Sequence, residues 1–397
     1  MDNSSYKSLY NTFLVFTMLY LCKQLTLWEF YQDAVPLFRW ISTLLAVFVI
    51  TNCISKYEGN EYIFIITIGL IVFFVGYNSE NITNLLLSFV AVVGARGVMF
   101  RDIIKVHFIF GLSFCFFNIF GRELGLIPET YLITGNEREG TFGNIIARED
   151  YGYGTPTDFA IHVFYILLDY WILKKRQLKG SEILFYLCVV FFLIYYSDAR
   201  LASICILLII ILSLSLPLFH KNTFFISYIV KPSFIICIPI FALISVVGTI
   251  MYDETDLFWI GADLLFSGRL HLGQDAIIEA GIPMFGQVYE MYGVGNLAAG
   301  ADYNYIDCSY LQALVLWGVV LSVILIASFV KISQSASRRM DYVLLSAIFL
   351  AGLSGVIAQF LFFLAFCPLV IAFSAMHEDD EIVETSEVVP LQEGDEI

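Results

Sequence analysis

Four polar side chains stand at helical spacing in an otherwise apolar stretch and are the first candidates for chemistry. They lie at intervals of four, three and four residues and are Asp158, His162, Tyr165 and Asp169. This spacing places them on one face of a helix, which Pro156 can open because its missing N–H costs nothing in the first turn. Ionisable groups in an apolar helix indicate a functional site, and a satisfied packing network is the alternative.

A second set of candidates is basic. Arginine presents a planar fork that binds phosphate oxygens in bidentate fashion and keeps its charge in a partly desolvated site. Six arginines and no lysine occupy the connections that the topology below assigns to the outer face: Arg39, Arg122, Arg138, Arg148, Arg200 and Arg269. We interpret this preference as a site for pyrophosphate, with loop anchoring to acidic residues as the alternative. Arg200 differs from the rest because Asp198 lies beside it in a short link between apolar stretches.

The segment from Ser267 to Gly281 contains both Arg269 and His271. Its residues 270–280 have the pattern of an amphipathic helix lying at a membrane interface. Aromatic residues surround it in the sequence, as either ordinary interfacial residues or faces for sugar rings. They are Trp259, Tyr289, Tyr292, Tyr303, Tyr305 and Tyr310.

Other kinds of site are missing from the sequence. The eight cysteines are scattered without a Cys-x-x-Cys pair or metal-ligand spacing. The chain has no Asp-x-Asp cluster of the type that binds metal in nucleotide-sugar transferases, no phosphate-cradling Gly-Lys loop and no dinucleotide fingerprint. We therefore expect no catalytic metal, no cofactor and no nucleic-acid partner.

A membrane bundle has to position these candidates. Hydrophobic residues make up 59% of the 397 residues and charged residues only 14%, against about 25% charged in soluble domains. The apolar runs are continuous rather than alternating, which excludes a β-barrel. We predict an all-α polytopic membrane protein with about twelve spans. They lie near 9–28, 37–55, 61–77, 82–99, 102–121, 157–173, 182–197, 200–217, 232–251, 307–330, 342–358 and 360–376.

Basic residues in short connections set the orientation. The cluster from Lys174 to Lys179 and the other basic connections fall on one side if there are twelve spans, so that side and both termini are predicted to be cytoplasmic. Residues 1–376 then form a single transmembrane domain with long outer loops at 122–156 and 252–306. Residues 377–397 carry nine acidic residues and no basic one, and we expect a disordered cytoplasmic tail.

The layout resembles the Wzy-type polysaccharide polymerases, and more distantly the O-antigen ligases, in four local motifs that share their order and predicted outer location. The motifs are Arg148 with Tyr-Gly-Tyr-Gly-Thr-Pro-Thr-Asp158, Ser197-Asp-Ala-Arg200-Leu-Ala, Ser267-Gly-Arg269-Leu with Phe285-Gly286, and Asp307-Cys308-Ser309-Tyr310-Leu311. Position 308 is cysteine where the relatives have asparagine, and Thr157-Asp158 stands where many have Pro-Asn.

This resemblance implies a metal-independent membrane glycosyltransferase of the lipid-donor, GT-C-like type in the bacterial cytoplasmic (inner) membrane. Such an enzyme polymerises undecaprenyl-pyrophosphate-linked oligosaccharide repeat units on the outer face. Its implied partners are that lipid-linked oligosaccharide, membrane lipid, a chain-length regulator and a flippase. The candidate catalytic residues are Asp158, Asp307 and His271. The candidate substrate-binding residues are Arg148, Arg200, Arg269, Arg138 and Tyr310.

Two other functions fit the same sequence. A ligase would use the same chemistry but pass the finished glycan to a different acceptor. A lipid-linked oligosaccharide flippase or secondary transporter would carry its polar residues near the membrane midplane, and such proteins often show internal repeats. We find no repeat between the two halves of this chain.

The topology can be tested with introduced cysteines. A cysteine at position 296 lies in a predicted outer loop, so it should react from outside with a membrane-impermeant thiol reagent, whereas a cysteine at position 178 should not. Labelling with the reverse pattern would overturn the assignment of the two faces.

Overall fold

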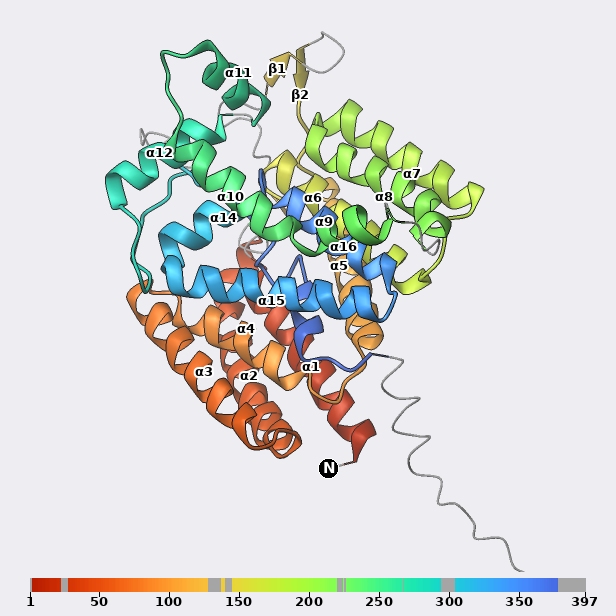
Figure 1. The fold of residues 1–397 in the computed structure, drawn as a ribbon, viewed down its shortest axis with the longest axis vertical. Helices are drawn as coiled ribbons and strands as arrows, with labels where there is room; N and C mark the ends of the chain where they lie inside the picture. The colour runs from red at the N-terminus through yellow and green to blue at the C-terminus, as the bar shows by residue number, and fades with distance from the viewer. Residues whose placement is uncertain are drawn as a thin grey trace, which may run out of the picture.

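The computed structural model describes residues 2–22, 28–127, 137–139, 145–219, 224, 226–266, 268–293 and 304–377 (Figure 1). Nearly every element is helical, in agreement with the predicted class. The helices are α1 (Asn3–Leu21), α2 (Glu29–Cys53), α3 (Asn60–Asn78), α4 (Ile82–Gly94), α5 (Phe100–Glu123), α6 (Pro156–Lys174), α7 (Gly180–Phe192), α8 (Arg200–Phe219), α9 (Lys231–Ile235), α10 (Cys237–Ile250), α11 (Leu257–Leu265), α12 (Arg269–Ala280), α14 (Ser309–Gln312), α15 (Gly318–Arg338) and α16 (Tyr342–Ser354).

Short elements complete the fold. Strands β1 (Glu137–Glu139) and β2 (Ile145–Ala147) pair antiparallel in the first long loop, with Arg138 opposite Ile146. Turns of π-helix follow α7 and α14, and a third precedes α9. Turns of 3-10 helix occur after α2 and near the end of the chain. Their bounds are Leu193–Ser197, Ile226–Val230 and Ala313–Trp317 for the π-helical turns, and Ile54–Lys56 and Leu369–Phe373 for the 3-10 turns.

Six helical segments of the described chain are long and apolar enough to cross a membrane. They are Asp33–Lys56, Asn60–Asn78, Phe100–Glu123, Gly180–Ser197, Arg200–Phe219 and Ser309–Arg338. A further pair, Ser227–Ile235 and Cys237–Ile250, passes the same criteria together but is bent by 60° at its break. Many large apolar side chains on these segments are exposed, as on a lipid-facing surface; Leu70, for example, is 65% exposed. The protein is therefore an α-helical membrane protein.

The prediction of twelve helical spans is wrong for the last of them. The first eleven predicted spans overlap helices, but residues 360–376 form turns and one short 3-10 helix. This segment is apolar because it packs inside the bundle: Leu361 and Cys367 are completely buried. Helix α16, with 13 residues, is also shorter than the roughly 20 residues that a full crossing needs.

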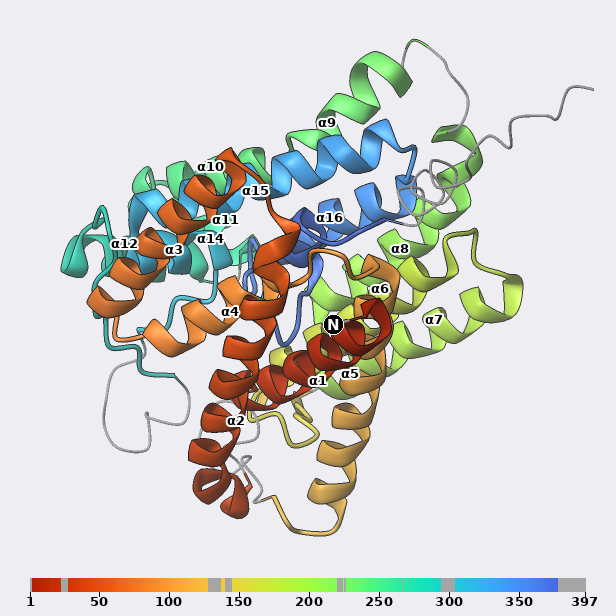
Figure 2. The ribbon, with the colours of Figure 1, turned by 90° about the horizontal axis from the view of Figure 1, so that it is seen from below.

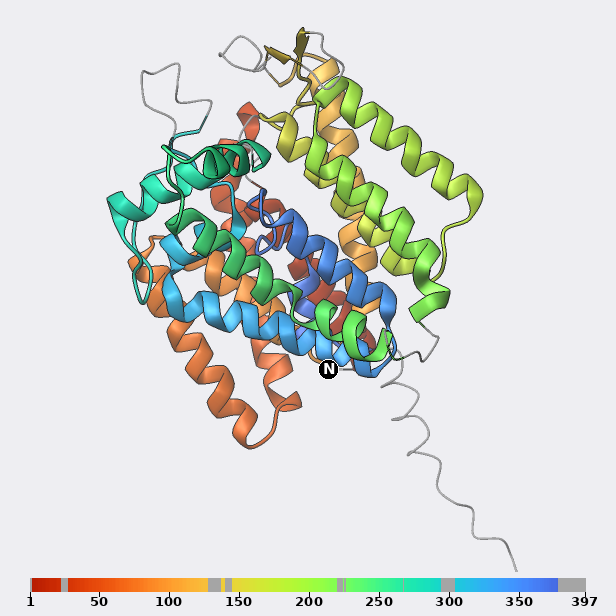
Figure 3. The ribbon, with the colours of Figure 1, turned by 45° about the horizontal axis from the view of Figure 1, so that its top comes forward.

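The bundle surrounds this C-terminal segment. In the view of Figure 2 the dark blue chain lies at the centre, among α4, α6 and α16. In Figure 3, α5 to α8 stand on one side of it and α2 to α4 on the other. The large hydrophobic core runs through all of these helices, with Trp171, Tyr10 and Phe329 among its fully buried side chains.

Residues 283–287, in the loop after α12, pack into the break in the helix at Gly318, where α15 begins. Gly318 at the break has φ +82°, and a Cβ there would meet the Met284 carbonyl oxygen at 2.8 Å. The amide N–H of Val319 donates to the Pro283 carbonyl at 3.0 Å, and the Gln287 N–H donates to the Leu316 carbonyl at 3.0 Å. Glycine is required here because a side chain would separate the two segments.

The two ends of the bundle differ in their contents. In Figure 1, α11, α12 and the β-hairpin lie together at the top, and we call this the α12 end. The N-terminus lies at the opposite end, where Lys7 pairs with Asp102 and Met376 pairs with the chain beside Phe100. We call it the tail end. Two of the predicted cytoplasmic connections lie close together, since Lys175 is 3.9 Å from Asp341. Which end faces the cytoplasm stays a prediction.

One of the proposed labelling positions needs correction. Leu178 is only 5% exposed, so a cysteine there would be shielded whichever way the protein faces. Lys179 is exposed and immediately precedes α7 in the same connection. Lys179→Cys is therefore the informative probe for the tail end.

The end of the chain closes the fold by a β-bridge. The Met376 N–H donates to the Val98 carbonyl at 2.9 Å, and the Phe100 N–H donates to the Met376 carbonyl at 2.8 Å. Residues 378–397, where the acidic tail is predicted, lie outside the described residues.

Truncation on either side of this bridge should have different effects. A chain that ends after Met376 should unfold at the wild-type temperature, whereas one that ends after Ser374 should lose about 1–3 kcal/mol because both bridge hydrogen bonds disappear. Thermal unfolding in a mild detergent measures the difference. Equal stability of the two truncated chains would show that the bridge contributes nothing.

Candidate functional site

The chain between α16 and the last 3-10 turn passes through the bundle without forming a helix. We call residues 355–368 the unwound segment. Several of its backbone groups bond to side chains from elsewhere. The Ser309 hydroxyl donates to the Ala358 carbonyl at 2.5 Å and accepts from the Leu361 N–H at 3.2 Å. Buried backbone groups need such partners, so this segment fixes the side chains that serve it.

Arg269, the first residue of α12, joins the unwound segment to the entrance of α14. Its Nε donates to the Ile357 carbonyl at 2.8 Å, and one terminal nitrogen lies 3.0 Å from the Asp307 carboxylate. The Arg269 side chain is 15% exposed and that of Asp307 is 23% exposed. A partly desolvated guanidinium of this kind suits binding of an anion that reaches it from the surface.

Tyr305 and Gln359 extend the same arrangement. The Tyr305 hydroxyl donates to Gln359 Oε1 at 2.6 Å, and the Gln312 amide donates to the same oxygen at 3.2 Å. Burial raises the pKa of Tyr305, and the charge of Asp158 raises it further, followed by that of Asp307. Asp158 is therefore near Tyr305, although about 150 residues of sequence separate them. We call Asp158, Arg269, Tyr305, Asp307 and Gln359 the outer cluster.

Helix α6 presents Asp158 at its N-terminus. Thr155 caps the helix, its hydroxyl accepting from the Asp158 N–H at 3.1 Å, and Pro156 occupies the first turn as predicted. A carboxylate in the first turn is stabilised by the unpaired N–H groups of the helix. The position makes Asp158 the one acidic member of the outer cluster that a helix end supports directly.

A second arginine group lies at the same end, around the link between α7 and α8. The Nε of Arg148 donates to the Ser197 carbonyl at 2.8 Å, and Arg122 lies 3.9 Å from Glu149. Arg200 lies 3.4 Å from Asp198, which confirms the predicted pair. Asp198 is 1% exposed, so Arg200, whose side chain is 59% exposed, is held by a buried carboxylate while facing outward.

The backbone at Asp198 is left-handed, with φ +43°. Such a conformation costs energy for a residue other than glycine, and a short polar side chain lowers that cost by bonding locally. The turn therefore directs Arg200 at the start of α8 while Asp198 remains inside. Beside this link, burial and the charge of Glu149 raise the pKa of Tyr151 to about 12.

The polar stripe on α6 faces the bundle interior, as predicted. His162 and Tyr165 are each 1% exposed and Asp169 is 2% exposed. The Tyr165 hydroxyl lies 3.1 Å from the Ser354 hydroxyl, and His162 Nδ1 lies 2.5 Å from the Tyr153 hydroxyl. His162 Nε2 is buried without a hydrogen-bond partner among the described residues.

Asp169 is paired with His107 of α5. His107 Nδ1 lies 2.5 Å from the Asp169 carboxylate, and its Nε2 lies 3.2 Å from the Ala365 carbonyl. Each ring nitrogen of His107 therefore has an oxygen neighbour within hydrogen-bond distance. This arrangement stabilises the contact of α5, α6 and the unwound segment, and it explains how Asp169 is tolerated inside the bundle.

Two predicted site residues have other surroundings. His271 Nδ1 lies 2.7 Å from the Asp263 carboxylate, which also accepts the Leu270 N–H at 2.7 Å. His271 is two residues from Arg269 and therefore points to the opposite side of α12. Asp263 caps the start of the helix by accepting from the Leu270 and His271 N–H groups, and His271 pairs with it rather than joining the outer cluster.

Tyr310 is 3% exposed, and its hydroxyl donates to the Gly352 carbonyl at 2.9 Å. It packs within the bundle rather than on the surface beside Arg269. The side chain of Arg138 lies outside the described side chains, as does Tyr303.

Sequence reasoning missed three members of this region. Gln359 follows a break marked by Gly352, Ser354 and Gly355. Its own side chain, a single amide in an apolar run, was the signal that could have identified it. His107 likewise interrupts an apolar span. Asp263 had no local signal, because its role depends on the tertiary position of α12.

Comparisons with known proteins found no relative of this chain. No protein-family model, curated protein or solved structure matches the chain. The resemblance to the polymerases thus rests on the sequence motifs. Among the described residues, no group of three or more histidine, cysteine, aspartate or glutamate side chains is arranged to hold a metal ion.

The dependence of the unwound segment on Ser309 can be measured. Ser309→Ala leaves the Ala358 carbonyl and the Leu361 N–H without this partner, so we expect a loss of about 2–4 kcal/mol in unfolding free energy. Ser346→Ala is the matched control, because the Ser346 hydroxyl is buried without a partner among the described residues. A thermal shift for Ser309→Ala no larger than that of the control would contradict the role assigned to Ser309.

Proposed function

We propose that the protein polymerises undecaprenyl-pyrophosphate-linked oligosaccharide repeat units at the α12 end of the bundle, as a metal-independent membrane glycosyltransferase. The observation that carries the proposal is the convergence of Arg269, Asp307 and Asp158, from three distant parts of the chain, in one partly exposed cluster. The second arginine group lies at the same end. Cations for a departing pyrophosphate and carboxylates for proton transfer are the groups that this reaction requires.

In the proposed reaction, the side chains stabilise the leaving group and accept a proton. The acceptor hydroxyl oxygen forms a bond to the anomeric carbon of the donor sugar, and the bond from that carbon to the pyrophosphate oxygen breaks. The bonding electron pair leaves with the lipid pyrophosphate, whose growing charge Arg269 and Arg200 stabilise. The proton of the hydroxyl passes to a carboxylate.

Asp158 is the base in this proposal. Asp307 is already engaged by Arg269 at 3.0 Å, which suits it to position the guanidinium. His271 lies on the other side of α12 with Asp263. Asp158 stands in the first turn of α6, and its charge raises the pKa of Tyr305. Tyr305 and Gln359 would orient the sugar through their hydroxyl and amide groups.

A ligase would use the same cluster, and the identity of the acceptor separates the two enzymes. A deletion strain of a polymerase should retain single repeat units attached to their final acceptor, whereas loss of a ligase removes attached glycan altogether.

A lipid-linked oligosaccharide transporter is the second candidate, and the buried polar chain of α5 and α6 favours it. The His107–Asp169 pair and His162 lie within apolar helices, and the unwound segment resembles the broken helices of transporters. Purified protein distinguishes the two functions. A polymerase lengthens lipid-linked repeat units in detergent, where a transporter leaves them unchanged.

Substitution of arginine by lysine tests the outer site most sharply. A lysine at 269 keeps the charge but cannot bond the Ile357 carbonyl, Asp307 and a phosphate from one planar fork. We expect Arg269→Lys and Arg200→Lys to lower the elongation rate by about 30- to 1,000-fold, equivalent to about 2–4 kcal/mol of transition-state stabilisation. The assay is elongation of purified lipid-linked repeat units.

Arg39→Lys is the control, since Arg39 is exposed on α2 and belongs to neither arginine group. Its rate should equal that of the wild type. Thermal unfolding of all three variants separates lost activity from lost fold. Near-wild-type elongation by both Arg269→Lys and Arg200→Lys would remove these residues from the active site.

A further inference from the structure

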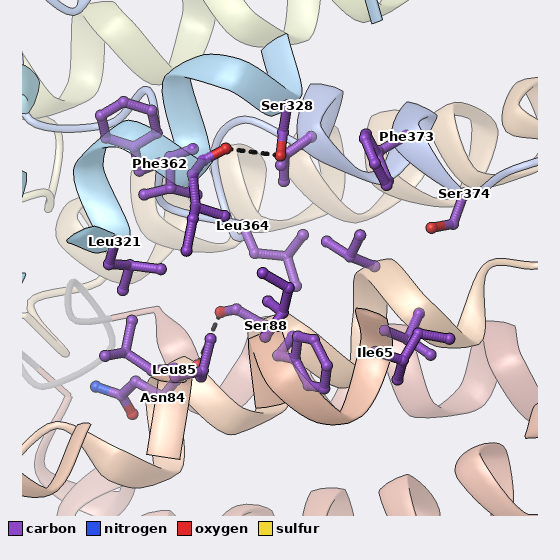
Figure 4. Close-up of a pocket in the computed structure, with 18 of the residues that line it drawn as sticks. Ile65, Asn84, Leu85, Ser88, Leu321, Ser328, Phe362, Leu364, Phe373 and Ser374 are labelled. Atoms are coloured by element: carbon purple, nitrogen blue, oxygen red, sulfur yellow. Dashed lines mark hydrogen bonds between the residues drawn. The ribbon is translucent and has the colours of Figure 1, made fainter. Parts of the chain in front are cut away.

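A cavity lies between α3, α4, α15 and the C-terminal segment. Its volume is about 610 Å³, within the roughly 300–1,000 Å³ usual for ligand sites. Figure 4 shows Leu85 and Ser88 of α4 facing Leu321 and Ser328 of α15 across it. We call it the α4 groove.

The groove follows α4 along its whole length. Its α4 lining runs from Asn84 through Ser88 to Val92 at helical intervals of four residues, so these residues share one face of the helix. Thirteen residues of α-helix span about 20 Å. The walls are mainly apolar, and the hydroxyls of Ser88 and Ser328 donate to carbonyls of their own helices. A hydrocarbon chain suits a space of this length and polarity.

Among the described residues that line the groove, the charged ones lie at the tail end. Arg96 and Lys331 line it there, together with Glu61, which lies 3.5 Å from Arg96. Lys331 lies over the ring of Phe373 and has no acidic partner among the described residues. One positive charge is therefore left over at the mouth of an apolar groove.

The described residues at the opposite end of the groove are uncharged. Asn81 and Asn84 line it, near the point where Asn78 of α3 donates to the Phe285 carbonyl of the loop after α12. An anionic headgroup would consequently sit at the tail end, and no residue of the outer cluster lines the groove. The groove is thus separate from the proposed pyrophosphate site.

We propose that the α4 groove binds an anionic phospholipid, with one acyl chain along α4 and the phosphate beside Lys331 and Arg96. Basic residues between transmembrane helices attract anionic headgroups, and apolar walls bind the chain that the headgroup carries. A bound lipid of this kind would fill the space between α4 and α15 and join the N-terminal helices to the rest of the bundle. The inference does not depend on the proposed polymerase activity.

Thermal unfolding in a mild detergent provides the test, with bound lipid counted by native mass spectrometry. Dioleoyl phosphatidylglycerol should raise the unfolding temperature more than dioleoyl phosphatidylcholine, since a ligand that binds only the folded state stabilises it. sn-Glycerol 3-phosphate, which has the phosphate without the chains, should produce no shift. An equal effect of glycerol 3-phosphate would instead indicate a site for free anions.

Two variants separate the headgroup from the chain. Lys331→Gln should weaken the apparent Kd for phosphatidylglycerol by about fivefold and leave that for phosphatidylcholine unchanged. Ser328→Phe should fill the groove and weaken both lipids. If that variant does not fold, Ser88→Leu tests the same point from the opposite wall.

Lys174→Gln is the matched control, because Lys174 is a tail-end lysine at the end of α6 that does not line the groove. It should bind both lipids as the wild type does. The proposal is overturned if wild-type protein binds the two lipids equally, or if Lys331→Gln and Lys174→Gln behave alike.

Discussion

The backbone of the unwound segment is the constraint on which the rest of the structure depends. Residues 355–368 pass through the interior of a helix bundle without the continuous hydrogen bonding of a helix. Inside a membrane, an unpaired peptide group costs several kcal/mol, and irregular chain is tolerated only where protein supplies its partners. Ser309, Arg269 and His107 supply them here, from α14, α12 and α5. Three distant helices are therefore held in place by one stretch of chain.

The same constraint couples stability to the candidate site. Arg269 serves the Ile357 carbonyl and the Asp307 carboxylate with different nitrogens of one guanidinium. Gln359 belongs to the unwound segment and receives the Tyr305 hydroxyl. The site is accordingly rigid on the side of the bundle, where rotations of Arg269 are limited by its carbonyl partner. Preorganised donors of this kind need little rearrangement when charge develops on a bound phosphate.

Local signals in the sequence were sufficient for much of the fold. Eleven of the predicted apolar ranges overlap helices, and six helical segments are long and apolar enough to cross a membrane. Pro156 marked the start of α6, and the spacing of Asp158 to Asp169 predicted a stripe whose inner members are buried. Residues 360–376 were mistaken for a helix because hydropathy does not distinguish lipid from protein interior. The surroundings of His271 were also beyond the sequence, since its partner Asp263 comes from the folding of α11 onto α12.

The β-bridge at Met376 has a consequence for biosynthesis. Its partner strand, at Val98 to Phe100, is made when about a quarter of the chain has been synthesised, and it has no bridge partner until the last part of the fold emerges. The unwound segment enters the bundle equally late. Helices α1 to α5 must therefore remain in the membrane with an open interior while about 250 further residues are added. Assembly of this protein is limited by contacts of long sequence separation, which form slowly and leave apolar surface exposed in the meantime.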